Sequence, residues 1–217
     1  MKPYLTTLVL LIAVAFCAAA LVPQVGSFRL TGDQQGYAPA QPLAFSHRLH
    51  AGELQIDCRY CHHGAETSKH AGIPAASVCM NCHKVISATM GALRAEDEAA
   101  EKEQRKPRRV TSPELRKLYD ALALDEKLEP VPGRTPMPLQ WVKIHNVADY
   151  VYFDHRAHVG AGVACQKCHG PVETMERVHQ VENLSMGWCV NCHRQVNKTG
   201  VGGQTVHATL DCVACHH

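Results

Sequence analysis

The chain contains 217 residues, carries a formal net charge of +2 and has only four phenylalanines and two tryptophans. The low charge argues against nucleic acid as a partner, because proteins that bind it present a strongly basic surface. So few large aromatic side chains leave little material for a packed core made of protein alone. The 11 cysteines and 15 histidines are the unusual part of the composition.

Residues 1–25 are expected to form a membrane anchor. An apolar run of residues 5–22 is interrupted only by two threonines and has nearly the length needed to cross a bilayer. A cleaved secretory signal is the alternative, because three alanines at residues 18–20 would suit a signal peptidase. We expect the segment to be retained. Lys2 precedes the run, which favours a cytoplasmic amino terminus and a periplasmic location, on the outer face of the inner membrane, for the remainder.

Five copies of the pattern Cys-x-x-Cys-His account for ten of the cysteines. Each copy is typical of a c-type haem attachment site, with two thioether bonds and a proximal histidine ligand. A zinc ribbon uses such pairs two at a time and would leave one over, and a disulfide framework gives no reason for the histidines. We therefore expect five covalently bound c-type haems, which would supply the missing core. The five motifs are residues 58–62, 79–83, 165–169, 189–193 and 212–216.

These motifs define the predicted haem-binding residues. The thioether cysteines are Cys58, Cys61, Cys79, Cys82, Cys165, Cys168, Cys189, Cys192, Cys212 and Cys215. The proximal iron ligands are His62, His83, His169, His193 and His216.

The motifs fall into two clusters, and each cluster follows a Phe-x-His-x-x-His element. These elements occupy residues 45–50 and 153–158. The repeat predicts a two-haem module over residues 26–90 and a three-haem module over residues 141–217. Residues 91–140 lie between them as a linker.

Three kinds of sequence follow one another in the linker. The charged residues 95–109 lack apolar periodicity and predict an exposed helix or mobile segment. Ser112 and Pro113 are a favourable start for a short amphipathic helix over about 113–123. Four prolines in residues 130–138 then predict an extended strap.

Histidines outside the motifs are candidates for the distal iron ligands. Imidazoles three residues apart can leave one helical turn and reach two neighbouring irons, which favours His47, His50, His155 and His158. For the fifth position His145 leads, since it lies in an apolar stretch just ahead of the second module. Met186 is the alternative, and its thioether would raise the potential of that haem. Also open for the fifth position are His63, His179, His207 and His217.

Together these features resemble the pentahaem subunit of bacterial alternative complex III, a quinol-oxidising respiratory complex. The likeness extends over nearly the whole chain. Smaller class III multihaem cytochromes share the Phe-x-His-x-x-His element but lack the long linker. The segments that carry the resemblance are the anchor and residues 46–50, 71–74, 79–83, 141–146, 151–159, 165–171 and 186–194.

The resemblance implies a mainly α fold with much irregular loop, little or no sheet and one N-terminal transmembrane helix, similar to class III cytochromes c. It also implies a relay rather than a catalyst. Electrons would come from quinol through the membrane subunits and an iron-sulfur, molybdopterin-type subunit, and leave to a monohaem cytochrome c or a terminal oxidase. Contact with the iron-sulfur subunit is expected over residues 95–140.

Two other functions stay open at this stage. A multihaem reductase would need an iron with an open coordination position, and the abundance of histidine argues against one. A direct quinol dehydrogenase would take electrons from quinol at its own membrane face.

Overall fold

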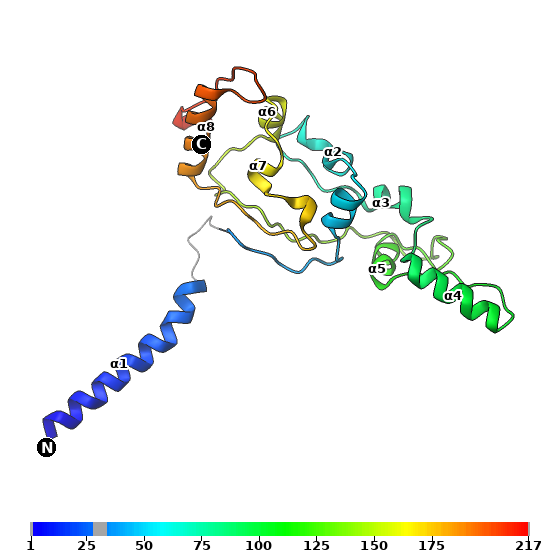
Figure 1. Cartoon of the computed structure of the whole chain (residues 1–217), viewed down its shortest axis with the longest axis horizontal. Helices are drawn as coiled ribbons and strands as arrows, with labels where there is room; N and C mark the ends of the chain where they lie inside the picture. The colour runs from blue at the N-terminus through cyan, green and yellow to red at the C-terminus, as the bar shows by residue number, and fades with distance from the viewer. Residues whose placement is uncertain (1, 28–33, 217) are drawn as a thin grey trace.

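The computed structural model describes residues 2–27 and 34–216. Short helices joined by long loops make up this part of the chain (Figure 1). Within the described ranges, β-structure is limited to three isolated bridges. The expected mainly helical fold without a sheet is therefore confirmed. The helices are α1 (Lys2–Ser27), η1 (Arg48–Glu53), α2 (Cys58–Cys61), η2 (His63–Ala65), α3 (Ala76–His83), α4 (Met90–Lys102), α5 (Pro113–Ala121), α6 (His155–Gly160), α7 (Gln166–His169), η3 (Val172–Thr174), α8 (Met186–Thr199) and η4 (Cys212–Ala214).

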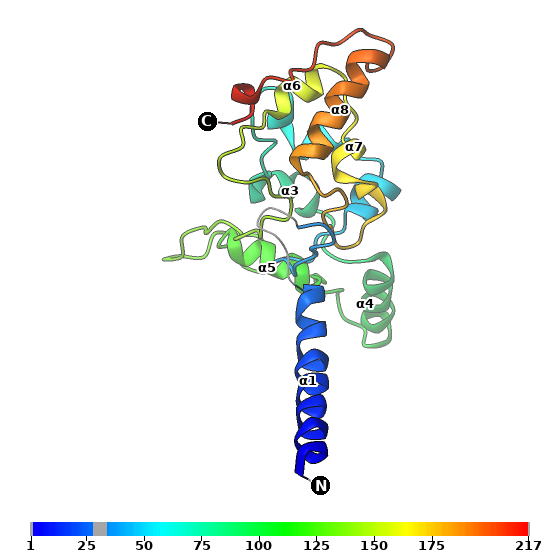
Figure 2. The same cartoon turned by 90° about the vertical axis from the view of Figure 1, so that its left-hand side faces the viewer.

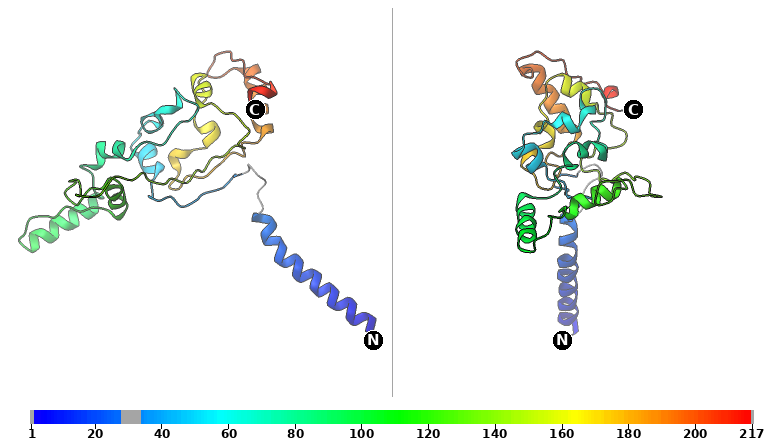
Figure 3. Two further views of the ribbon diagram at one scale, coloured as in Figure 1. Left: turned by 180° about the vertical axis from the view of Figure 1, so that it is seen from behind. Right: turned by 90° about the vertical axis from the view of Figure 1, so that its right-hand side faces the viewer.

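Helix α1 occupies the segment expected to be the anchor. It extends away from the rest of the described chain in all views (Figures 1, 2 and 3). Its described apolar side chains are exposed, among them Leu11 at 63% and Phe16 at 75%. The side chains of Lys2 and of residues 20–27, on which the expectation also depends, lie outside the described ones. Across the described residues, no helix combines the length and the apolar character needed to cross a membrane.

The expected linker forms two helices. Helix α4 covers much of the charged stretch and protrudes from the body (Figure 1). Glu96 on α4 accepts a hydrogen bond of 3.2 Å from the Arg105 guanidinium and one of 2.7 Å from the Arg108 backbone N–H, which ties the helix to the returning loop. Helix α5 starts where the sequence predicts, because the Ser112 hydroxyl accepts a hydrogen bond from the Leu115 N–H at its first turn.

A small protein core lies between α3 and α5. Leu118 and Tyr119 of α5 are 2% and 0% exposed, and Leu43 packs with them. The Tyr119 hydroxyl donates a hydrogen bond of 2.6 Å to the backbone carbonyl of His83. This core therefore fixes the end of α3, which carries the second Cys-x-x-Cys-His motif.

Candidate haem-binding sites

Each of the five motifs, numbered one to five in chain order, lies on a helix or a single helical turn. These helices are α2, α3, α7, α8 and η4. Cysteines three residues apart on such a turn lie on one face, and the histidine follows directly. All 11 cysteines are free thiols, so the structure gives the disulfide interpretation no support. The sulfur atoms of all five motifs are available for thioether bonds.

Four of the five proximal histidines face a second histidine from a Phe-x-His-x-x-His element. Two pairs come from η1 and two from α6, and every ring centre lies 6.1–6.4 Å from its partner's. The separations are 6.4 Å for His47 and His62, 6.1 Å for His50 and His83, 6.2 Å for His155 and His169, and 6.1 Å for His158 and His193.

This separation fits an iron ion held between two imidazoles. An imidazole nitrogen binds a metal at about 2.0 Å and lies roughly 1.1 Å from its ring centre, so two opposed ligands have centres about 6.2 Å apart. The residues present therefore fit a haem iron at the first four motifs.

Backbone carbonyls orient most of these imidazoles. In six of the eight, Nδ1 lies 2.5–2.8 Å from a carbonyl oxygen, which cannot donate, so Nδ1 carries the proton. Nε2 is then left with its lone pair, as an iron ligand requires. The pairs are His50 with Ser46, His62 with Gly72, His83 with Ile86, His155 with Lys69, His158 with Asp154, and His193 with Thr209.

Burial keeps the other two imidazoles neutral. Desolvation, together with the nearby His62 and His50, lowers the pKa of His47 to about 4. Desolvation, with His145 as the largest charge effect, lowers the pKa of His169 to about 3. Both are therefore unprotonated at neutral pH and can serve as metal ligands.

The two Phe-x-His-x-x-His elements share the same contacts between their phenylalanine and histidine rings. Phe45 stacks on His50 at 4.3 Å and meets His47 edge-on at 4.9 Å. Phe153 repeats both contacts, at 4.6 Å to His158 and 4.8 Å to His155. Each phenylalanine ring thus contacts both imidazoles of its own element, and these two imidazoles face different proximal histidines.

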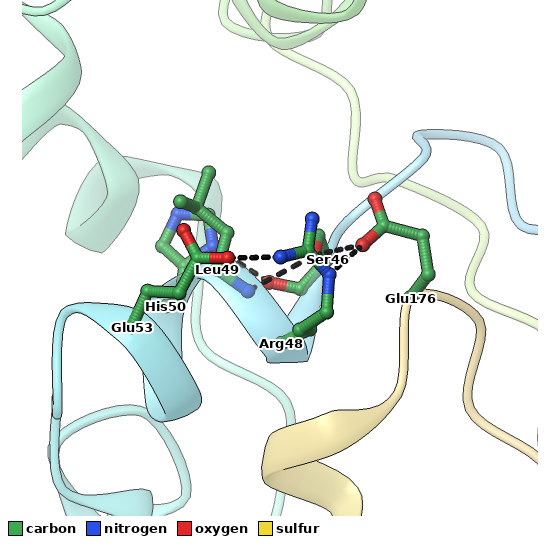
Figure 4. A network of polar contacts seen from close by, with 6 residues as sticks. All are labelled: Ser46, Arg48, Leu49, His50, Glu53 and Glu176. Atoms are coloured by element: carbon green, nitrogen blue, oxygen red, sulfur yellow. Dashed lines mark hydrogen bonds and ion pairs between the residues drawn. The ribbon is translucent and has the colours of Figure 1, made fainter.

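A network of polar side chains holds the first element against the second half of the chain (Figure 4). Glu176 accepts hydrogen bonds from the Ser46 hydroxyl at 2.7 Å and from the Arg48 guanidinium at 3.0 Å. The Ser46 hydroxyl in turn accepts one from the Leu49 N–H, and the Ser46 carbonyl accepts one from His50. No sequence pattern singled out Glu176, because it lies 130 positions from Ser46.

The fifth motif differs from the other four. Among the described residues, no histidine ring is found opposite His216; the ring beside it is that of Tyr150, 5.8 Å away. The structure therefore brings no distal ligand to the fifth site within the described ranges.

The candidates for this position lie elsewhere. His145, the leading one, contacts His169 edge-on at 4.3 Å, and its buried Nε2 has no hydrogen-bond partner among the described groups. It therefore lies beside the third site rather than the fifth. Met186 is 71% exposed at the start of α8. His63 and His207 are exposed, His179 is half-buried, and His217 lies outside the described residues.

Comparison with known proteins gives two family matches. Residues 25–108 match the class III cytochrome c family, and residues 151–217 match the family of cytochrome c7 and related cytochromes c. A related protein is the menaquinone reductase multihaem cytochrome c subunit of Nitratidesulfovibrio vulgaris (strain Hildenborough). It is 21% identical over 196 residues, which cover 81% of this chain and 76% of that protein.

The chain is a multihaem cytochrome c. Its mainly helical fold is of the class III type, and its role is electron transfer through several covalently bound haems. It is a cytochrome of the periplasmic type, and the paired cysteines and opposed histidines described above are the residues that would hold its haems. A haem supplies an iron that changes reversibly between the ferric and ferrous states, and the chain orients that iron's ligands.

Proposed function

We propose that this multihaem cytochrome c carries five haems and relays electrons for a membrane complex that oxidises quinol, as the resemblance to alternative complex III implies. The observation that carries the relay role is the set of four histidine pairs at the spacing of two iron ligands. An iron closed on both sides by imidazole cannot bind a substrate, so it exchanges electrons only. The partners are an iron-sulfur subunit, integral membrane subunits, and a monohaem cytochrome c or terminal oxidase as acceptor.

The reverse direction is a second candidate, favoured by the similarity to a menaquinone reductase subunit. Electrons flow towards the couple of higher potential, so the haem potentials relative to the quinone decide between the two. A potentiometric titration of the purified holoprotein tests this. Most haems titrating above the menaquinone couple would support quinol oxidation, and most titrating below it would support menaquinone reduction.

An open fifth site would favour a third function, reduction of a small molecule at iron. Its support is that no described histidine faces His216. Titration with carbon monoxide after reduction tests it. The relay predicts that no haem binds the gas stoichiometrically in the intact chain, whereas binding by one haem per chain would support the reductase.

As part of the same proposal, helix α1 attaches this cytochrome to the membrane. Its described apolar side chains are exposed on several sides, and no described charged side chain interrupts them. Extraction of membranes with alkaline carbonate tests this. An anchored chain stays with the lipid, and a chain released into the supernatant would contradict the anchor.

A further inference from the structure

Within each module, neighbouring sites share one histidine element. His47 and His50 of η1 face the first and second sites, respectively. The Asn81 side chain of the second motif also donates a hydrogen bond of 2.9 Å to the Tyr60 hydroxyl of the first. The first and second sites are therefore adjacent, and α6 joins the third and fourth sites in the same way through His155 and His158.

The two modules meet through the first and third sites. The Lys69 carbonyl, in the loop after the first motif, accepts a hydrogen bond of 2.8 Å from Nδ1 of His155, the histidine that faces the third site. The backbone N–H groups of His155 and Arg156 bond to Lys69 and Ser68 in the same loop. One module thus orients a ligand of the other.

The reciprocal contact is equally close. The Arg48 N–H at the start of η1 donates a hydrogen bond of 2.9 Å to the carbonyl of Met175, which follows the third motif. Gly52 approaches the Glu173 backbone so closely that a Cβ there would clash with the carbonyl oxygen. The thiols of Cys58 and Cys165 are also neighbours: burial is the main cause that raises the pKa of Cys58, and the nearby Cys165 adds to it.

The fifth site adjoins the fourth. Nδ1 of His193 in the fourth motif donates to the Thr209 carbonyl, and the Asn197 side chain pairs with the backbone of Ala208, just ahead of the fifth motif. The loop before α6 contacts the same region, because the Tyr152 N–H donates a hydrogen bond of 2.8 Å to the Cys215 carbonyl. Figure 1 shows the motif helices following one another as α8, α7, α2 and α3 along the long axis.

We propose that the five attachment sites form a single row in the order second, first, third, fourth, fifth, which differs from their order in the chain. This inference rests on the proposed function of a five-haem relay. The first and third sites make the junction between modules, and the second and fifth sites are the two ends at which partners exchange electrons. At each junction one ferrous iron is oxidised as its ferric neighbour is reduced, with no other reactant.

A redox titration of the oxidised full-length holoprotein followed by NMR of the haem methyl groups tests the order. Reduction of one haem lowers the affinity of its neighbours for an electron, and this effect falls with distance. We expect reduction of the second haem to shift the apparent potential of the first haem roughly twice as much as it shifts the apparent potential of the third haem. A shift of the third haem as large as that of the first would overturn the proposed order.

Ligand variants identify the signals and sharpen the test. His50→Met should raise the potential of the second haem, so that it is reduced first and shifts the first haem alone. The matched variant His158→Met acts on the fourth haem and should shift two neighbours, the third and the fifth. If a variant does not fold, the wild-type titration decides the order by itself. Fewer than five haems by mass spectrometry would instead contradict the proposed function.

Discussion

Orientation by a backbone carbonyl is the common feature of the paired histidines. Six of the eight donate Nδ1–H to a carbonyl. For His50 and His158 that carbonyl lies four residues earlier, just before the helix, and for His155 it comes from the other module. A hydrogen bond from Nδ1–H to a carbonyl fixes the orientation of the ring. It also raises the basicity of Nε2, which makes Nε2 a better ligand. Which distal candidate faces which proximal histidine is given by the ring separations in the structure and not by spacing in the sequence.

Replacing His155 tests one ligand directly. In His155→Ala we expect one haem to become high-spin while the number of attached haems stays at the wild-type value, because the thioether bonds do not depend on the distal side. Low-temperature EPR and intact-protein mass spectrometry measure these two properties. His207→Ala, at an exposed histidine, is the control and should leave the spectrum unchanged. An unchanged spectrum for His155→Ala would remove His155 from the ligand set.

The Glu176 network gives a prediction about positioning. Glu176→Ala removes the acceptor for Ser46 and Arg48, so η1 should be held less firmly, and the EPR signals of the first two haems should broaden. The Glu176 side chain is 67% exposed, so solvent screens its ion pair and the loss of stability should be small. Glu103→Ala is a matched control, since Glu103 is 61% exposed and pairs with Arg105 away from the haem sites. Equal spectra for the two variants would contradict a positioning role.

At the scale of elements, the sequence predicted those that depend on local signals. Helix α5 begins at its Ser112 cap, and both Phe-x-His-x-x-His elements form helical turns, although η1 is a π-helix and α6 an α-helix. Asp154, which caps α6 by accepting from the Arg156 N–H, follows the usual preference for Asp before a helix and could have been found in advance. The contacts of η1 with residues 173–176 join distant parts of the chain, and no local pattern predicts them.

Helix α4 should respond to acid. Hydrogen bonds from Arg105, and then from the Arg108 N–H, lower the pKa of Glu96 to about 2 from an ordinary value of 4.5. Because the folded-state pKa is depressed, the stabilisation is present above pH 4.5 and is lost as the pH falls towards 2. Hydrogen-exchange protection of the α4 amides should therefore fall over this range.

Glu96→Gln provides the comparison for α4. The amide keeps an acceptor for Arg105 but does not titrate, so its protection should be lower than wild type at neutral pH and should change little between pH 4.5 and 2. If protection of the α4 amides depended on pH in the same way in wild type and Glu96→Gln, a group other than Glu96 would be responsible for the acid response of the helix.

At the scale of the whole molecule, the repeated motifs predict two haem modules, but they do not predict how these two parts of the chain are placed relative to each other. The sequence separates the modules by a long linker, yet the structure packs the first element of one directly against the first motif of the other. The linker forms a separate arm, α4, and a small core around Tyr119. Position along the chain therefore does not predict which sites adjoin.

The most direct test of the five-haem relay is a spin count on the fully oxidised holoprotein by low-temperature EPR, combined with haem counting by mass spectrometry. The five motifs predict five haems, and the four histidine pairs predict that at least four of them are low-spin with two imidazole ligands. The near-parallel rings of the first and third sites, at 4° and 12°, should give rhombic signals, and the second site, at 58°, a signal with a larger maximum g value. Fewer than four low-spin haems per chain would contradict the account.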